Sequence, residues 1–531
     1  MTPVLNFFGF KLIMLKYNFL APMIKITKIY PFLNELKGSR VGLILSWLII
    51  ISTYFLGLNL PLIGPDEPRY SQVAREMLQR SDFITPTLGG VPWLEKPALL
   101  YWIQIFFYSI FGVSEFSARL GSAIFGIGTI LTIWLLMQAS TGDKKLSELT
   151  AYILATSIGL ITFSHAASFD IILTFPITAA LSSFFLGFLY LENFERKKAL
   201  ALFFCFYFFI GIALLAKGLV GIILPFFALF IFQLSLYVLS KKFPHRLFLL
   251  TLPIGLLISG LVACTWYLPM YQLHGFKFID EFIIQHHFAR YTSNKYLHPQ
   301  PFWFFWIVLP LMTLPWTPYF LIAIRKLIRN LRHEISIDSE AHATEAKLII
   351  FAISWILSPL LFFSFSGSKL PGYILPSLPA TAILMAIYLN RNKSNIIEHL
   401  KYSALLIVLL IAIVFISFAE FFIRHETLKP LIEKSNQMGY QDAKILNLHT
   451  ISHNLEFYGA GRLVRLADGK QRYFYGPAEI LEFMRVNNEN LVLVVVPFQY
   501  ETDITQNSSI QAEKIGDNGE LILFAVRLKD D

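Results

Sequence analysis

The chain has 531 residues, of which 55% are hydrophobic and only 15% are charged, and 51 of them are phenylalanine. A soluble domain carries about 25% charged residues, so this composition excludes an ordinary soluble protein and predicts one that crosses a membrane several times. The net charge of +9 is typical of the Lys/Arg excess in cytoplasmic loops, and we expect no nucleic-acid partner. Both cysteines, Cys205 and Cys264, lie in apolar segments, which excludes a disulfide framework.

The first forty residues are basic and contain no small-residue cleavage site after a short apolar core. We therefore expect residues 1–40 to form a cytoplasmic leader rather than a cleaved signal peptide. Residues 41–60 then run without any charge. At about 1.5 Å per residue this segment matches the roughly 30 Å of a bilayer core, so it is the first predicted span.

The basic loops determine which apolar segments span the membrane. If every segment spanned, Lys144-Lys145 and each later basic cluster would fall outside the cytoplasm; if 97–112 does not span, all of them fall inside, as the positive-inside rule requires. Segment 97–112 is also the shortest. We predict that it is an interfacial helix in a long first periplasmic loop, 64–118, with the N-terminus cytoplasmic and the C-terminus periplasmic. The expected transmembrane domain covers 41–421 and has about 11–13 spans, drawn from the apolar segments 41–60, 119–139, 148–165, 171–190, 199–216, 218–239, 247–265, 301–322, 347–365, 373–390 and 402–421.

The composition changes after residue 421. Segments 442–448, 490–497 and 520–527 have the apolar runs of strands, and 477–487 has a helical pattern that begins at a proline. We expect residues 422–531 to form a small periplasmic α/β domain.

Two adjacent carboxylates, Asp66 and Glu67, follow the first span and open a helical pattern that runs to about Gln79. Asp66 is a good helix N-cap residue, and a carboxylate at a membrane mouth is equally well placed to accept a proton or hold a polar acceptor. Both readings remain open from the sequence.

Further charged residues stand at the outer ends of the predicted spans. Lys96 is either a ligand for a lipid phosphate or an interfacial lysine that snorkels to the membrane surface. Asp170, among apolar residues, needs an ion-pair partner, water or a helix end to cap. Arg290, three residues after His287, is able to grip a phosphate with two hydrogen bonds. The loop from Lys369 to Tyr373 offers a cation and a phenol, or simple turn chemistry.

These residues converge on one face of the membrane. Two separated carboxylates with several phosphate-compatible cations suit the transfer of a group from a lipid phosphate to a polar acceptor, since the cations neutralise charge that develops on the departing phosphate. A metal held by Glu95 and a histidine is an alternative, but nothing in the sequence supplies the further ligands that zinc requires.

The chain resembles the bacterial lipid A aminoarabinose transferases, within the superfamily of polyprenyl-phosphate-sugar glycosyltransferases that includes the protein mannosyltransferases. The resemblance covers about residues 41–390. It rests on DEPRYSQVAREML (66–78), the WLEKP segment, the FARY stretch after His287, and KLPGYILPSLP (369–379).

The resemblance implies an α-helical membrane fold of the type C glycosyltransferases, with juxtamembrane helices in the first periplasmic loop. It implies that Asp66 and Asp170 are the catalytic acids and that Lys96, Arg290 and Tyr373 hold the carrier phosphate. In relatives, residues like Glu95 and His287 meet a divalent metal; no cofactor is otherwise expected. The remaining implied site residues are Glu67, Arg69, Tyr70 and Lys369.

The expected function is therefore transfer of a sugar, such as an amino sugar, from undecaprenyl phosphate to a lipid A phosphate at the periplasmic face of the inner membrane. Inversion and retention at the anomeric carbon both remain open. One alternative keeps the donor and changes the acceptor to a protein hydroxyl or another envelope glycan. A lipid transporter or flippase is a third reading, which the absence of a convincing internal repeat disfavours.

Overall fold

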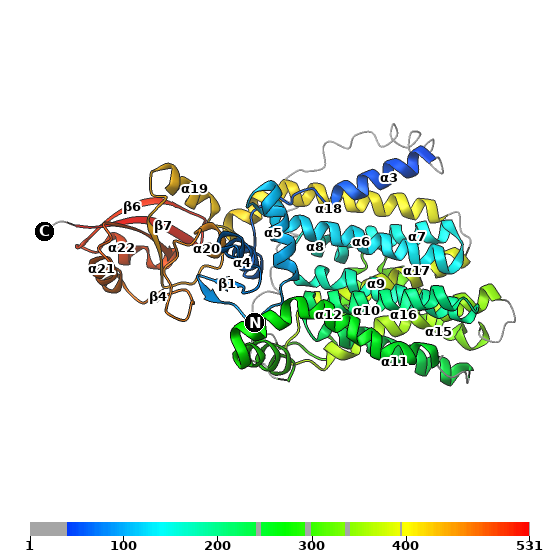
Figure 1. Cartoon of the computed structure of the whole chain (residues 1–531). Coiled ribbons are helices and arrows are strands. Elements are labelled where there is room, and N and C mark those ends of the chain that lie inside the picture. Colours follow the sequence, from blue (N-terminus) through cyan, green and yellow to red (C-terminus); the bar gives the residue numbers. More distant parts are fainter. Residues whose placement is uncertain (1–39, 241–245, 293–298, 335–339, 393–395, 530–531) are drawn as a thin grey trace, which may run out of the picture.

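The computed structural model describes residues 40–529, apart from 241–245, 293–298, 335–339 and 393–395. The predicted cytoplasmic leader lies, except for its last residue, outside the described residues. Figure 1 shows a bundle of long helices with a small sheet domain at one end, and the helix α4 (Asp66–Arg80) between the two.

Seven helical segments of the described chain are long and apolar enough to cross a membrane, and two bent helix pairs raise this number to nine. The predicted multi-span fold is thus confirmed. The seven segments are α6 (Glu115–Thr141), α9 (Phe169–Glu192), α10 (Arg196–Lys217), α11 (Val220–Ser240), α12 (Arg246–Phe278), α16 (Glu340–Ser364), and η2 (Pro371–Ser377) with α17 (Leu378–Arg391).

The two bent pairs differ from the straight spans that we expected over 148–165 and 301–322. The first pair is α7 (Lys144–Ala155) with α8 (Ile158–Ser164), bent by 60°, and the second is α14 (Phe304–Met312) with α15 (Thr317–Glu334), bent by 115°. Pro315 interrupts the second pair, because proline has no N–H for a helical hydrogen bond.

The two breaks are joined by hydrogen bonds. Trp316 Nε1 donates to Thr156 Oγ1 at 2.9 Å, and the Ile158 N–H donates to the Leu314 carbonyl at 2.9 Å. Backbone groups that a break leaves free inside a membrane must find partners in the protein. Each of the two bends therefore supplies hydrogen-bond partners to the other.

The first predicted span is shorter than expected. Helix α3 (Arg40–Thr53) has 14 residues, after which the chain turns, with Gly57 at a φ of +77°. The last helix of the bundle along the chain, α18 (Ile396–Glu426), continues beyond residue 421 and leads into the sheet domain. The predicted boundary at 421/422 stays a prediction.

The first outer loop holds α4, a short hairpin and α5 (Leu99–Phe111). The hairpin pairs β1 (Thr87–Leu88) with β2 (Val91–Pro92). Because 13 residues extend only about 20 Å as a helix, α5 cannot cross a bilayer core of roughly 30 Å. This agrees with the predicted interfacial helix.

The sheet domain has strand order β4-β3-β5-β7-β6, in which β3 is parallel to β4 and β5, and β7 is antiparallel to β5 and β6. The three predicted strands and the predicted helix α21 (Pro477–Val486) are present. Strands β4 and β6 were not predicted. The strands are β3 (Lys444–Leu448), β4 (Tyr473–Phe474), β5 (Leu491–Pro497), β6 (Ile510–Asp517) and β7 (Leu521–Leu528), and the other helices are α19 (Lys429–Gln437), α20 (Leu455–Tyr458), η3 (Phe498–Tyr500) and α22 (Glu501–Thr505).

Candidate functional site

A cavity of about 530 Å³ opens at the end of the bundle where α4 lies. Its wall comes from segments far apart in the sequence: the start of α4, the loop before α5, the start of α9, the end of α10, the π-helix η1 (Ile279–Ala289), and the turn between α16 and η2. The polar and charged residues that line it are Asp66, Glu67, Tyr70, Glu95, Lys96, Ser168, Asp170, Lys217, His286, Tyr291, Ser366 and Tyr373.

Asp66 is the first residue of α4 and stands at the cavity. The N-cap residue is Pro65, and no side-chain capping bond is recorded for this helix. The Asp66 side chain is 53% exposed, and its Oδ1 lies 3.8 Å from Arg69 Nη1, which is longer than a hydrogen bond. The capping alternative is thus not supported, and the carboxylate is available to a ligand.

Glu67 differs from its neighbour, because its carboxylate is engaged inside the protein. Arg119 Nε donates to Glu67 Oε1 at 3.0 Å, and Arg119 Nη2 donates to Oε2 at 2.6 Å. The backbone N–H groups of Ile63 and Ala167 donate to the same carboxylate at 3.0 and 2.7 Å. The structure therefore gives Glu67 a supporting role, and because Glu67 also lines the cavity, its predicted substrate contact stays a prediction.

Asp170 is the second residue of α9 and does not cap it, because the N-cap residue is Ser168, whose Oγ accepts the Asp170 N–H at 3.1 Å. The Asp170 carboxylate forms an ion pair with Lys217, the last residue of α10. The Lys217 ammonium also lies 4.7 Å from the centroid of the Tyr373 ring. The second acid is thus paired with a cation, whereas Asp66 is largely open.

Gly372 permits the close approach of η2 to Asp170. A Cβ at this position would overlap Asp170 Oδ2 and lie 2.8 Å from Phe163 Cε1. The glycine in the predicted Lys369–Tyr373 loop is therefore required by space, and it brings Tyr373 next to the acid.

Glu95 and Lys96 line the cavity from the loop before α5. Glu95 Oε1 lies 3.7 Å from His286 Nε2. Among the described residues no group of three or more His, Cys, Asp or Glu side chains is arranged to hold a metal ion. The side chains of His287 and Arg290, which we also predicted at the site, lie outside the described part, so the metal ligands and the predicted phosphate contact of Arg290 stay predictions.

Two predicted cations do not line the cavity. Arg69 stands beside it, with its guanidinium 5.3 Å from the centroid of the Trp93 ring. Lys369 is 7% exposed and donates to the carbonyls of Ser366 and Gln300 at 2.6 and 3.0 Å. Burial lowers the pKa of Lys369, and its hydrogen bonds hold the loop, in place of the predicted contact with an anionic headgroup.

Tyr70 lines the cavity but is only 7% exposed, and its ring packs edge-on against Phe169 at 4.8 Å. Burial and, next, the Asp66 carboxylate raise the pKa of Tyr70 well above its ordinary value. Tyr70 therefore stays neutral and supports the wall between the two acids.

The sequence reasoning did not assign Lys217 and Tyr291 to the site. Tyr291 donates to the Phe362 carbonyl at 2.9 Å, which joins α13 (Arg290–Thr292), the short helix after η1, to α16. The position of Lys217 in the sequence could have indicated a site residue, because it is a lone lysine at the outer end of a predicted span, where the positive-inside rule disfavours a lysine.

The cavity holds two acids in different electrostatic settings, with cations beside them. It lies at one end of a multi-span bundle, next to the helices of the first outer loop. These features define a membrane-embedded transferase of the type C glycosyltransferase fold. The family model of dolichyl-phosphate-mannose-protein mannosyltransferase matches residues 44–278. A protein of Aquifex aeolicus, described as uncharacterized, is 31% identical over 390 residues, which are 73% of this chain and 71% of that protein. Over residues 44–278 the chain is therefore similar to the protein mannosyltransferases, and it belongs to one family with the Aquifex protein.

The undecaprenyl phosphate-alpha-4-amino-4-deoxy-L-arabinose arabinosyl transferases are similar over about two thirds of the chain. The protein of Yersinia pestis is 30% identical over 370 residues, and that of Serratia proteamaculans is 27% identical over 363 residues. These matches cover 68% and 67% of this chain, and they span about three fifths of those proteins (61% and 60%).

The fold extends the likeness to almost the whole chain. The crystal structure of ArnT from Cupriavidus metallidurans bound to undecaprenyl phosphate matches with a TM-score of 0.70 at 20% identity, over 92% of this chain and 98% of that one. Its apo form matches with a TM-score of 0.68. The predicted type C fold, including the small C-terminal domain, is confirmed.

Proposed function

We propose that this protein transfers a sugar from undecaprenyl phosphate to a phosphate of lipid A, and that the sugar is an amino sugar. The single observation that carries the proposal is the cavity in which an open carboxylate, Asp66, faces a site with the cations Lys96 and Lys217 and the phenol of Tyr373. The similarity to the aminoarabinose transferases supports the choice of donor and acceptor.

In the proposed reaction an oxygen of the acceptor phosphate attacks the anomeric carbon of the sugar. The bond between that carbon and the polyprenyl phosphate oxygen breaks, and its electron pair stays on the departing phosphate. Lys96 and Tyr373 neutralise the charge that develops there, with Arg290 as a further predicted contact. Asp66 orients the acceptor, and it would take a proton if the acceptor were a hydroxyl.

We also infer that the cavity faces the periplasm and that both Asp66 and Asp170 are reached from that side. The opposite ends of the helices carry basic residues: α7 begins at Lys144, α10 begins at Arg196, and α17 ends at Arg391. Basic ends of this kind favour the cytoplasmic side. Labelling of single cysteines at the cavity end and at the opposite end with a membrane-impermeant thiol reagent, in a background without Cys205 and Cys264, tests this orientation.

The reaction is tested by incubating the purified protein with undecaprenyl-phosphate aminoarabinose and lipid A, and measuring lipid A by mass spectrometry. A mass increase equal to one sugar supports the proposal. Sugar on a protein serine or threonine, and none on lipid A, would favour the protein-glycosylating alternative. Flipping of the donor in liposomes without any glycosyl product would favour a transporter.

A further inference from the structure

The helix that carries Asp66 is polar on a side that is nevertheless buried. Ser71, Gln72 and Glu76 of α4 are 0%, 2% and 9% exposed. A loop helix of this composition would normally turn such residues to water. Here α4 packs against α5, against the hairpin and against α20 of the C-terminal domain, although α4 and α20 are almost 400 residues apart in the chain.

The first contact between the two helices joins Arg75 of α4 to Phe457 of α20. The Arg75 guanidinium lies 4.0 Å from the centroid of the Phe457 ring, and its Nη2 donates to the Phe457 carbonyl at 2.6 Å. Burial lowers the pKa of Arg75. A cation withdrawn from much of the solvent needs compensation, and the C-terminal domain supplies both of these contacts to the half-buried Arg75 through one residue.

The second contact reaches the chain just before Asp66. The Tyr458 hydroxyl accepts the N–H of Leu62 at 2.7 Å and donates to Glu115 Oε1 at 3.1 Å. Glu115 is the first residue of α6 and is also paired with Lys429 of α19 at 2.6 Å. The neighbouring residues Phe457 and Tyr458 therefore hold the segment 62–75 on both sides of Asp66.

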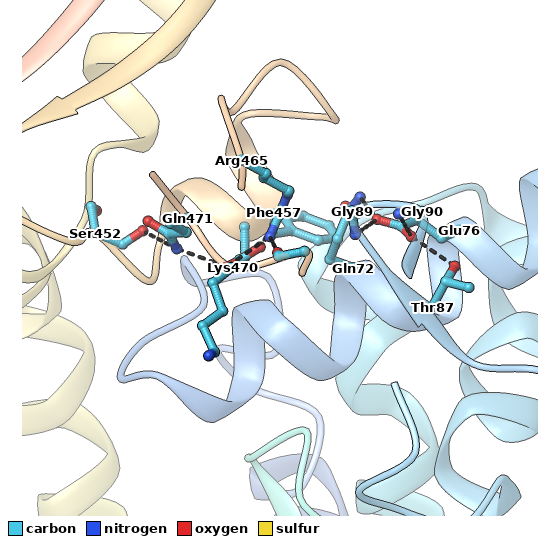
Figure 2. A network of polar contacts seen from close by, with 12 residues as sticks. Gln72, Glu76, Thr87, Gly89, Gly90, Ser452, Phe457, Arg465, Lys470 and Gln471 are labelled. Carbon is cyan, nitrogen blue, oxygen red and sulfur yellow. Dashed lines mark hydrogen bonds and ion pairs between the residues drawn. The ribbon is translucent and has the colours of Figure 1, made fainter. Parts of the chain in front are cut away.

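A third contact lies at the hairpin that follows α4 (Figure 2). Glu76 accepts hydrogen bonds from Thr87 and from the N–H groups of Gly89 and Gly90, at 2.8, 2.7 and 3.1 Å. Arg465 of the C-terminal domain lies against Gly89 so closely that any Cβ there would overlap its side chain. The guanidinium of Arg465 is itself held by an ion pair with Glu456 of α20.

We propose that the C-terminal domain is a positioning part of the active site: α20, through Phe457 and Tyr458, holds the segment 62–75 and thereby fixes Asp66 at the cavity. The expected effect on turnover rests on the proposed function. The contacts by which α20 holds the segment 62–75, which we call the hold, do not depend on any substrate. Phe457 and Tyr458, and Arg75 that Phe457 contacts, do not line the cavity.

The first test compares two tyrosine variants with matched chemistry. Tyr458→Phe removes the hydroxyl that joins Leu62 to Glu115. Tyr440→Phe removes a hydroxyl that donates to Glu513 at 2.7 Å and accepts from Arg527 at 3.2 Å, entirely within the C-terminal domain. We expect Tyr458→Phe to lower kcat about tenfold with the donor KM within about twofold, because a small misplacement of a catalytic group reduces rate more than binding. Tyr440→Phe should turn over like the unchanged protein.

The second test compares arginine variants. Arg75→Gln removes the cation, whereas Arg75→Lys keeps a cation above the Phe457 ring and should restore part of kcat. The control is Arg472→Gln, since the Arg472 guanidinium lies 4.5 Å from the centroid of the Phe474 ring inside the C-terminal domain. The order of kcat expected is unchanged protein and Arg472→Gln first, then Arg75→Lys, then Arg75→Gln.

Hydrogen–deuterium exchange of residues 62–80 supplies a readout that does not depend on turnover. Faster exchange in Tyr458→Phe and Arg75→Gln, and unchanged exchange in the two controls, supports the hold. Exchange and kcat like those of the unchanged protein in both variants would overturn the inference. If even the unchanged protein transfers no sugar, the proposed function fails, and the exchange rates still support or overturn the hold.

Discussion

Glu67 of α4 and Arg119 of α6 form a buried ion pair through two hydrogen bonds of 3.0 and 2.6 Å, with side chains that are 9% and 5% exposed. The Glu67 carboxylate also accepts the N–H of Ala167, three residues before Asp170. Because Glu67 directly follows Asp66, one carboxylate connects the backbone segments of both proposed catalytic acids. The pair therefore sets the separation of Asp66 and Asp170.

We expect Glu67→Gln to destabilise the protein and to reduce transfer, because removal of one partner leaves the other charge buried. The expected loss of stability is about 3–5 kcal/mol. Thermal unfolding in detergent measures it, with Glu501→Gln as the control: Glu501 pairs with Lys514 at 3.1 Å on the surface, and its loss should cost less than about 1 kcal/mol. Equal melting temperatures for the two variants would contradict the role of the pair.

Asp66→Asn should leave the protein folded and lower the transfer rate by about 10²–10⁴ or more, the range of a lost general base or orienting acid. Folding should persist because the Asp66 side chain is half exposed. Size-exclusion elution and lipid A mass spectra from cells that produce the variant check both parts. Asp442→Asn, at an exposed carboxylate of the C-terminal domain, is the control, and normal lipid A modification by Asp66→Asn would refute the role.

Removing Lys217 and removing Asp170 should change the affinity for undecaprenyl phosphate in opposite directions. Lys217→Met leaves the Asp170 carboxylate without its ion-pair partner in the cavity and should weaken binding of undecaprenyl phosphate, because like charges repel. Asp170→Asn leaves the ammonium unneutralised and should preserve or tighten that binding while kcat falls. Binding of the carrier lipid to the purified variants, measured by thermophoresis or calorimetry, separates the two. A weaker affinity in both variants would show that the pair acts as a structural unit.

Gly372→Ala should abolish most activity, since the added methyl group meets Asp170 Oδ2. The expected loss of kcat is about 10²-fold, as for other small displacements of catalytic groups. Gly260→Ala serves as the control, because a Cβ at Gly260 in α12 has open space around it. Unchanged turnover in Gly372→Ala would mean that the position of Asp170 is unimportant.

His453 of the C-terminal domain gives a dependence on pH. Partial burial and, next, the Arg69 guanidinium lower the pKa of His453 below its ordinary value of 6.5, although much of the side chain is exposed, so the effect on stability is small. The unfolded chain then binds the proton more readily than the folded one, so stability is fully present above about pH 6.5 and is lost as the pH falls below it. The melting temperature should decline less between pH 6.5 and 5 in His453→Gln than in the unchanged protein. An identical decline in both would exclude this histidine as a cause.

The sequence by itself determined the class of protein and most of its helices, because uninterrupted apolar segments and basic loops are local signals. It also determined three strands of the sheet domain. Strand β6 was missed because it is an edge strand in which only Ile510 and Ile515 are buried. Local apolar patterns are weak where one side of a strand faces water.

Only the tertiary structure separated Asp66 from Glu67. Two adjacent carboxylates look alike in sequence, but Arg119, 52 residues away, takes one of them and leaves the other open. The same holds for Tyr458, whose hydroxyl meets Leu62 across 396 residues. Contacts of this kind depend on how the helices pack. Packing brings together residues that are far apart in the chain, and their separation in sequence does not predict that they pair.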